Sequence, residues 1–186
     1  TIVTTVYDFI NEKRNPDSAW PLGETDETYE NIDLLITDYE EALRLSGCDS
    51  LDAAAKSLIE KGTSALVVTN GAKEVFAYSN GEFFSPIKAV LPLSHAVEDA
   101  RVEGPVHGDT TGAGDNFAGG VIASLITQMQ YAGRGAFDLR EACIWGIASG
   151  DFACFYIGGT YIEKYPGEKK KHIQSIYNQY IQENKK

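Results

Sequence analysis

Apolar runs rich in valine and isoleucine alternate along the chain with stretches in which apolar residues recur every three or four positions. The runs are typical of buried strands and the stretches of amphipathic helices, so the alternation predicts β-α-β units around a largely parallel sheet. The strand candidates are residues 1–9 (TIVTTVYDF), 31–37 (NIDLLIT) and 64–71 (SALVVTNG).

Two helices are predicted between the second and third of these strands. Asp38 can cap the first helix and Gly47 can end it, because a side-chain oxygen satisfies amides at a helix start and glycine adopts the left-handed stop. Ser50 or Asp52 can cap the second helix, which Gly62 ends. Both predictions depend on short capping patterns around an apolar periodicity.

The dipeptide Asn80-Gly81 lies between two apolar stretches, EVFAYS and EFF. Asn-Gly is the favoured sequence of a two-residue hairpin turn, so we expect a local antiparallel pair at this point. From residue 86 to residue 105 the pattern is irregular and predicts no element.

The third part of the chain is predicted to be helical. Phe117, Val121 and Leu125 recur at spacings of four, which predicts a helix that begins in the glycine-rich segment 108–120 (GDTTGAGDNFAGG). Two more helices are expected over residues 138–158 and 168–186.

Size and charge narrow the classes of function. With 186 residues, 43% of them hydrophobic, the chain can bury the core of one domain or of a large part of one. Its 16 lysines and arginines against 27 aspartates and glutamates give a net charge of −11, which repels phosphate backbones. We therefore expect no nucleic-acid partner.

Cysteine and histidine usage argues against a zinc site or a disulfide framework. The cysteines are odd in number and lack C-x-x-C spacing, and no histidine lies near a cysteine or a second histidine. No apolar run reaches the ~18 residues of a membrane span. We expect a cytoplasmic protein with reduced thiols and no membrane partner. Because Thr1 opens a run that reads as a strand already inside a fold, we expect a fragment.

The glycine-rich segment is the strongest candidate for chemistry. A helix start exposes backbone amides and a partial positive charge, and both favour an anion. Gly112, Ala113 and Gly114 would let the backbone approach phosphate oxygens closely. A strand-to-helix turn that Asp115 merely caps would leave the same short pattern, so the glycine spacing alone leaves both interpretations open.

The flanking residues extend the pattern. The stretch DTTGAGDNFAGGVI (109–122) has neither the G-K-[ST] of a Walker A loop nor a G-x-G-x-x-G. It resembles, position by position, the C-terminal signature of the ribokinase-like (PfkB) sugar and nucleoside kinases. The resemblance implies that residues 112–114 form an anion hole for the transferring phosphate and that Asp115 is the catalytic base.

Two earlier motifs agree with this resemblance in order. DYEEA (38–42) is similar to the N-x-x-E motif that helps to organise magnesium, with Asp38 where asparagine is usual and Glu41 as the glutamate; taken alone, Glu41 would be an exposed helix residue. VVTNGAKEV (67–75) is similar to the T-x-G-x-x-G nucleotide strand, with Thr69 and Gly71 in place and Glu74 replacing the second glycine. A strand that ends in a turn is the alternative.

Further positions follow from the same resemblance. Asp109 and Thr111 match positions whose backbone carbonyls often hold a monovalent cation, although Asp109 could simply form a turn. The segment GDFACFYIGGTY, which starts at Gly150, is similar to the closing segment beside adenine. A buried helix that ends at glycines would also account for it.

The resemblance runs from about Thr1 to Tyr161 and covers only the C-terminal part of a family member. It implies a three-layer α/β/α ribokinase-like fold with a largely parallel sheet, without the N-terminal half and the lid. Residues 1–186 would then form one partial domain that carries the nucleotide-binding and catalytic part. An open sheet edge would favour a homo-oligomer or a complementary N-terminal chain as partner.

The implied function is ATP-dependent phosphoryl transfer to a hydroxymethyl group of a sugar or nucleoside. Its cofactors would be ATP, Mg²⁺ and a monovalent cation such as K⁺. The alternative is a non-catalytic nucleotide-binding or structural fragment of a kinase relative, which the altered Asp38 and the missing half favour.

Overall fold

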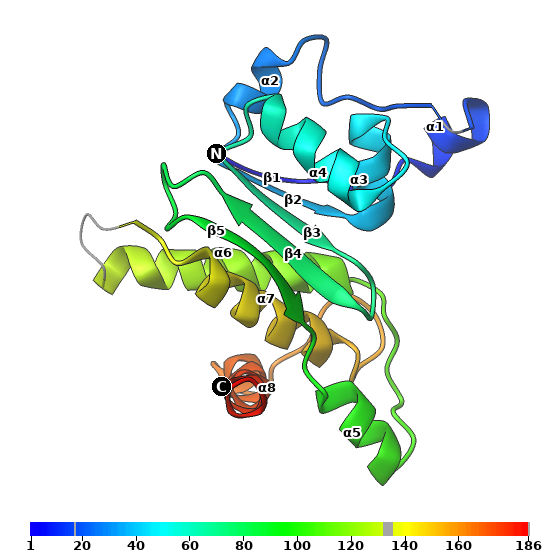
Figure 1. Ribbon diagram of the computed structural model, residues 1–186. Coiled ribbons are helices and arrows are strands. Elements are labelled where there is room, and N and C mark those ends of the chain that lie inside the picture. Colours follow the sequence, from blue (N-terminus) through cyan, green and yellow to red (C-terminus); the bar gives the residue numbers. More distant parts are fainter. Residues whose placement is uncertain (17, 132–135, 186) are drawn as a thin grey trace. The chain divides into compact units, whose positions relative to one another are not determined.

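The computed structural model describes residues 1–16, 18–131 and 136–185. The chain divides into two compact units, Thr1–Leu91 and Pro92–Lys186 (Figure 1). We describe each unit by itself. The expectation of one partial domain stays a prediction.

The first unit is built on a five-stranded sheet with the order β1-β2-β3-β4-β5. Strands β1, β2 and β3 run parallel, and β4 runs antiparallel to β3. The mostly parallel α/β sheet and the three neighbouring strands predicted from the sequence are therefore confirmed. The bounds are β1 (Ile2–Thr4), β2 (Leu34–Asp38), β3 (Ala65–Thr69), β4 (Glu74–Ser79) and β5 (Ile87–Pro92).

The helices between β2 and β3 follow the predicted caps. Asp38 caps α3 (Tyr39–Ser46), and Gly47 ends it with φ of 69°. Ser50, and not Asp52, caps α4 (Leu51–Glu60), because the Ser50 hydroxyl accepts the amide of Ala53. The strand predicted over residues 1–9 covers only Ile2–Thr4, and two short helices before β2 were not predicted, namely α1 (Phe9–Arg14) and α2 (Glu27–Glu30).

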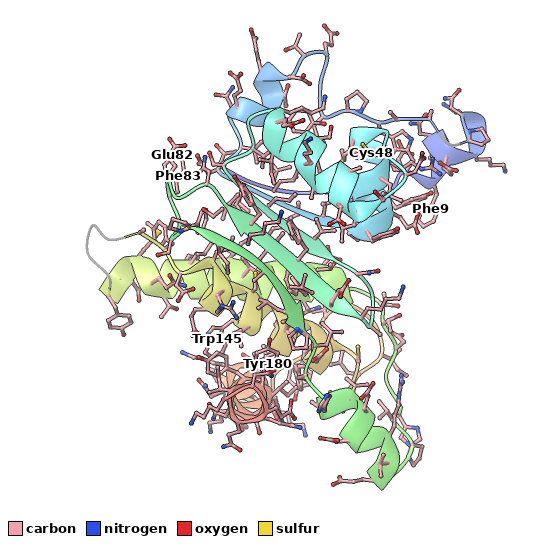
Figure 2. The ribbon with its side chains drawn as sticks, viewed as in Figure 1. Phe9, Cys48, Glu82, Phe83, Trp145 and Tyr180 are labelled. Atoms are coloured by element: carbon pink, nitrogen blue, oxygen red, sulfur yellow. The ribbon has the colours of Figure 1, made fainter. Side chains whose placement is uncertain are left out.

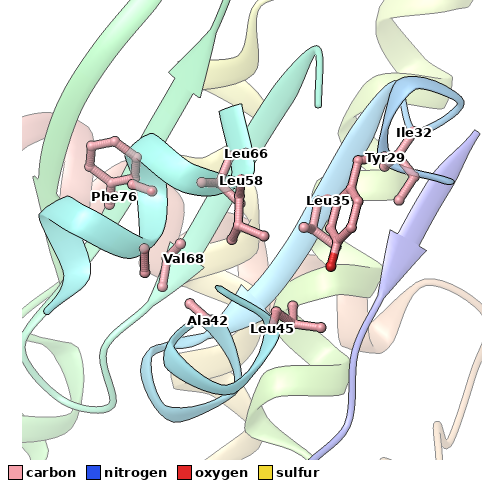
Figure 3. Close-up of a cluster of buried hydrophobic side chains, with 11 residues drawn as sticks. Tyr29, Ile32, Leu35, Ala42, Leu45, Leu58, Leu66, Val68 and Phe76 are labelled. Carbon is pink, nitrogen blue, oxygen red and sulfur yellow. The ribbon is translucent and has the colours of Figure 1, made fainter. Parts of the chain in front are cut away.

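Helices α3 and α4 lie against one face of the sheet (Figure 1). Leu35 of β2 and Leu66 of β3 are fully buried and pack with Leu58 of α4 in the cluster that Figure 3 shows. Burial at almost every position is typical of central parallel strands, which are covered from both sides. The continuous apolar runs in the sequence therefore correspond to β2 and β3.

The sequence is right that Asn80-Gly81 lies between two strands that pair, since β4 and β5 are neighbours in the sheet, but the predicted two-residue turn is wrong. Strand β4 ends at Ser79, and the next strand begins only at Ile87. Polar side chains bind the amides of this longer connection, since Gly81 N donates to Ser79 Oγ (3.1 Å) and Glu82 N donates to Asn80 Oδ1 (2.9 Å). Local side-chain bonds of this kind favour a turn over continued strand at these residues.

The other Asn-Gly pair in the chain makes the tight antiparallel connection, between β3 and β4. Asn70 N donates to the carbonyl of Glu74 across a distance of 2.9 Å. Gly71 follows with φ of 54°, in the left-handed region that favours glycine. This tight turn at Asn70-Gly71 was not predicted from the sequence.

The second unit contains α5 (Ala96–Glu103), α6 (Ala113–Tyr131), α7 (Leu139–Ala153) and α8 (Glu168–Glu183). Like β5, α5 falls in the irregular region and was not predicted. Helices α6 and α7 approach closely, because a methyl group on Gly120 would lie 2.6 Å from the carbonyl of Trp145. No helix in the described ranges is long and apolar enough to cross a membrane.

Helices α7 and α8 are joined by an aromatic pair. Trp145 of α7, labelled in Figure 2, stacks on Tyr177 with ring centroids 4.5 Å apart. Both side chains donate hydrogen bonds to the carboxylate of Glu141, at 3.0 Å from Trp145 Nε1 and 2.8 Å from the Tyr177 hydroxyl. This cluster fixes the distance between the two helices.

Asp151 of α7 is a partly buried carboxyl group bonded to the hydroxyl of Ser94, 2.5 Å away. Burial disfavours its charged form and raises its pKa to about 6, although the bonds to Ser94 act the other way. Between pH ~4 and ~6 the folded chain therefore holds a proton that the unfolded chain releases. This part of the stability falls as the pH rises through that window.

Replacing Asp151 with Asn should remove this pH dependence, because the amide cannot ionise and can still accept the Ser94 hydroxyl. We expect the free energy of unfolding of the variant, relative to the parent protein, to rise between pH 4 and pH 7 by at most roughly 3 kcal/mol. Urea unfolding of both proteins across this range measures it. A difference between the two proteins that does not change with pH would contradict the assignment.

Strand β1 lies at one end of the strand order and has Ile2 40% exposed. An apolar strand at a sheet edge is a template for pairing with further chain. The expected homo-oligomer or complementary partner stays a prediction.

Candidate active site

The glycine turn leads directly into α6, as the sequence predicts. Gly112 has φ of 72°, and the helix begins at the next residue, Ala113. Asp115 is exposed on the first turn of the helix. The carboxylate therefore stands beside the amides of the helix start.

The amides of the turn are not all available to a ligand. Ala113 N donates to the carbonyl of Thr110 at 3.1 Å. Within the described residues, the amides of Gly112, Gly114 and Asp115 have no protein acceptor. A helix start leaves such donors without partners, so these three amides are the ones that an anion can contact.

The segment after α7 packs against one side of the glycine turn. A methyl group on Gly112 would lie 2.7 Å from Cα of Gly159, and one on Gly108 would lie 2.0 Å from the carbonyl oxygen of Cys154. The amide of Asp109 donates to the carbonyl of Tyr156 at 3.2 Å. The glycines are therefore required by close backbone packing, whichever ligand binds.

Asp109 forms the turn with its side chain. The carboxylate accepts the amide of Thr111 at 2.8 Å and the amide of Gly158 at 3.3 Å. These bonds, the one from Thr111 first, hold the pKa of Asp109 below its usual value. The side chain of Asp109 therefore forms a turn, as the alternative interpretation expected. A monovalent cation at the backbone carbonyls of Asp109 and Thr111 stays a prediction.

The side chain of Asn116 connects three parts of the site, and sequence analysis did not identify it. Its Nδ2 donates to the carbonyls of Gly112 (2.8 Å) and Gly159 (3.0 Å), and its Oδ1 accepts the ammonium of Lys169 at 2.6 Å. The side chain is 7% exposed. A polar residue directly after Asp115, on a helix with an apolar buried face, was the available signal.

A cavity of about 820 Å³ opens between α6, α7 and α8. Asp115 and Asn116 line it from the start of α6, Gly159 from the segment after α7, Lys169 from α8 and Trp145 from α7. The cavity thus has the helix start of α6 on one side and a cationic side chain on another.

In the first unit, two predicted residues meet at the carboxyl end of the sheet. Asp38 and Thr69 are register neighbours at the ends of the parallel strands β2 and β3. In open α/β sheets, ligands bind outside this end of the strands. The sheet therefore places these two residues where a nucleotide or metal site is expected.

Glu41 is buried, with 6% of its surface exposed, so the alternative of an ordinary exposed helix residue is wrong. Its carboxylate and that of Asp38 form a reciprocal cap, with Glu41 N donating to Asp38 (2.8 Å) and Asp38 N donating to Glu41 (3.1 Å). The hydroxyls of Thr5 and Thr37 also lie within hydrogen-bond distance of the Glu41 carboxylate. Sequence reasoning missed both threonines, whose signal was their place at strand ends.

Within this cluster, the surroundings of Asp38 disfavour the charged form of its carboxyl group. Its pKa is raised, chiefly because burial disfavours the carboxylate and further because Glu41 and Glu40 are negatively charged nearby; the amide of Glu41 opposes this shift. A bound cation would relieve the repulsion. Carboxylate oxygens are also the donors that Mg²⁺ prefers.

Two predicted nucleotide contacts have different surroundings. Gly71 is exposed at the β3–β4 turn, with open space where a methyl group would lie. Gly150 lies in α7, and a methyl group there would be 3.2 Å from the carbonyl of Ala113. Close packing on α6 accounts for Gly150, and the nucleotide contacts of Gly71 and Gly150 stay predictions.

The predicted site residues fall into two groups. Asp38, Glu41, Thr69 and Gly71 belong to the first unit, and residues 109–115 and Gly150 belong to the second. Over the described part of the chain, no three His, Cys, Asp or Glu side chains gather closely enough to hold a metal ion.

A protein-family model described as pfkB family carbohydrate kinase matches residues 4–164. The chain belongs to the pfkB family of carbohydrate kinases. The match spans the cluster around Glu41, the β3–β4 turn and the glycine turn, so all the predicted site residues fall inside the family's region.

Solved structures show the same ribokinase-like fold. An Arabidopsis thaliana ribokinase complexed with ribose and ATP has a TM-score of 0.57, is 17% identical, and matches 95% of this chain and 46% of its own. An E. coli protein named as ribokinase II, in complex with ATP and Mg²⁺, has a TM-score of 0.55, 24% identity, and coverage of 81% and 42%. A Vibrio cholerae fructokinase double mutant, with fructose, ADP and potassium ion bound, has a TM-score of 0.52, 21% identity, and coverage of 72% and 38%.

The pfkB-family chain described here therefore spans less than half the length of these relatives. The mostly parallel sheet of its first unit agrees with the fold that the sequence resemblance implies.

Proposed function

We propose that this pfkB-family chain carries the phosphate-binding and catalytic part of an ATP-dependent kinase that acts on a hydroxymethyl group of a sugar or nucleoside. One observation carries the proposal. The exposed carboxylate of Asp115 lies on the same helical turn as three amides without protein acceptors, those of Gly112, Gly114 and Asp115 itself. A base and an anion site are thus adjacent.

In the proposed reaction, Asp115 accepts the proton of the acceptor hydroxyl as its oxygen attacks the γ-phosphorus of ATP. A bond forms between the acceptor oxygen and phosphorus, the bond to the β,γ-bridging oxygen breaks, and ADP leaves with that electron pair. The amides of Gly112 and Gly114 donate to the phosphoryl oxygens and stabilise their charge. Ala113 supports the turn through its bond to Thr110.

The remaining predicted residues are assigned to cofactors. Asp38 and Glu41 would hold Mg²⁺, which supplies charge neutralisation on the phosphates when bound. Thr69, Gly71 and Gly150 would contact the nucleotide, and the carbonyls of Asp109 and Thr111 would hold a cation such as K⁺. The relatives crystallised with ATP and Mg²⁺, and with ADP and potassium ion, support this set by analogy. A cytoplasmic location and a homo-oligomeric or two-chain assembly complete the proposal.

A second candidate is a fragment that binds nucleotide without catalysis. The observation that favours it is the coverage, since the chain spans less than half of the related kinases. Asp38 in place of the usual asparagine adds charge beside Glu41 and also favours it.

Calorimetric titration with Mg-ATP, followed by ADP release in the presence of a panel of sugars and nucleosides, separates the candidates. Saturable binding with acceptor-dependent ADP release supports the kinase. Binding without release on any acceptor supports the second candidate. A chain that binds neither ATP nor inorganic phosphate would contradict both.

A further inference from the structure

Lys169 is a partly buried cation without an anionic partner. Its Nζ donates to Asn116 Oδ1 at 2.6 Å. Across the ranges that the structure describes, no carboxylate lies within ion-pair distance of this ammonium, whereas Lys61 pairs with Asp26 and Lys56 with Glu60. Withdrawing an ammonium from water costs free energy unless a counter-charge compensates it.

The absence of a counter-charge is notable in this chain, which has a net charge of −11. The backbone amide of Lys169 does have a carboxylate partner, because it donates to Glu163 Oε1 at 2.8 Å. That contact fixes the start of α8 and leaves the ammonium to Asn116. An ammonium has three donors, so two remain for a ligand.

The position of this ammonium is set by the glycine turn. The Asn116 side chain that accepts it also donates to the carbonyls of Gly112 and Gly159. Lys169 and Asp115 line the same cavity. The ammonium and the first turn of α6 thus border one cavity, although Gly112 and Gly114 themselves do not line it.

We propose that Lys169 is a phosphate-binding residue and that Asn116 is the positioning residue that holds it at the glycine turn. The inference rests on the proposed function, which supplies the phosphate. The amides of Gly112 and Gly114 are uncharged donors, whereas Lys169 adds the full positive charge that a phosphoryl group attracts. A lysine serves here as a point charge that follows the group, because its ammonium is compact and its stem flexible.

The test is calorimetric titration of the chain with inorganic phosphate and with ATP. Lys169→Met keeps the length of the side chain and removes the charge, and it should weaken the binding of both ligands about tenfold or more, the usual worth of a charge-assisted bond. Lys169→Arg should restore most of the affinity. Lys171→Met is the matched control, because this exposed lysine lies on the same helix but outside the cavity. The affinity of this variant for both ligands should stay within about twofold of that of the parent chain.

Asn116→Asp tests the positioning role, with urea unfolding as a second readout because this change also removes the Nδ2 bonds to the carbonyls of Gly112 and Gly159. The new carboxylate would pair with Lys169 and cancel its charge, so phosphate binding should weaken about as much as in Lys169→Met. Lys169→Met with unchanged affinities and only a lower melting temperature would overturn the proposal, as would an equal loss in Lys171→Met. If the parent chain binds neither phosphate nor ATP, the proposed function itself fails and this inference fails with it.

Discussion

Phosphoryl transfer should fall by roughly 10²- to 10⁴-fold when Asp115 is replaced by Asn, while the affinity for ATP changes little. Asparagine keeps the size of the side chain and its place on the first turn of α6, but it cannot accept the proton of the acceptor hydroxyl. ADP release with the best acceptor of the panel gives the rate, and calorimetry gives the affinity.

Asp138→Asn is the matched control for this change. Asp138 caps α7 by accepting the amide of Glu141 at 2.9 Å, and asparagine caps helices equally well. Like Asp115→Asn, the control removes one carboxylate from the second unit, but it keeps the proposed base. Its rate of phosphoryl transfer should therefore equal that of the parent chain. Full activity of Asp115→Asn would place the base elsewhere, and an unfolded Asp115→Asn would make this aspartate chiefly a structural residue.

Two glycine-to-alanine changes should separate the fold of the turn from its phosphate binding. At Gly112, a methyl group would lie 2.7 Å from Cα of Gly159, and φ is 72°. We expect Gly112→Ala to lower the free energy of unfolding by about 1–2 kcal/mol from the left-handed backbone alone, with the contact adding to this, and to abolish phosphate binding.

At Gly114, a methyl group would meet nothing within 4 Å, and the residue lies inside α6. Gly114→Ala should therefore keep or raise stability, by up to about 1 kcal/mol, because alanine favours helix. The methyl group would nevertheless stand where the anion approaches the amide, so the Kd for inorganic phosphate should rise about tenfold. Urea unfolding and calorimetry measure the two effects. Unchanged phosphate affinity in Gly114→Ala would mean that no anion approaches this amide.

Most of the fold prediction depended on patterns among residues that lie close together in the sequence. The cap at Asp38 and the stop at Gly47 depend on side chains within a few residues, and the structure confirms both. The central strands were found because burial on both sides leaves continuous apolar runs. The start of α6 was found because apolar residues recur after the glycine turn.

Contacts between distant residues could not be predicted in this way. Lys169 and Asn116 are separated by 53 positions, and Thr5 and Glu41 by 36. Their meeting depends on helix packing and strand register, which a single sequence does not reveal. The two-residue turn at Asn80-Gly81 was wrong because nearby polar side chains bind the amides of Gly81 and Glu82 in a longer connection between β4 and β5.

The most direct measurement of the central claim is a ¹H–¹⁵N NMR titration of the chain with inorganic phosphate and then with ADP. The amides of Gly112, Gly114 and Asp115 donate to no protein acceptor in the described residues, so they should shift together and saturably as phosphate binds. Gly47, which ends α3 in the first unit, serves as the internal control and should not move. Saturable shifts confined to other parts of the chain, with the three amides unchanged, would contradict an anion site at the glycine turn.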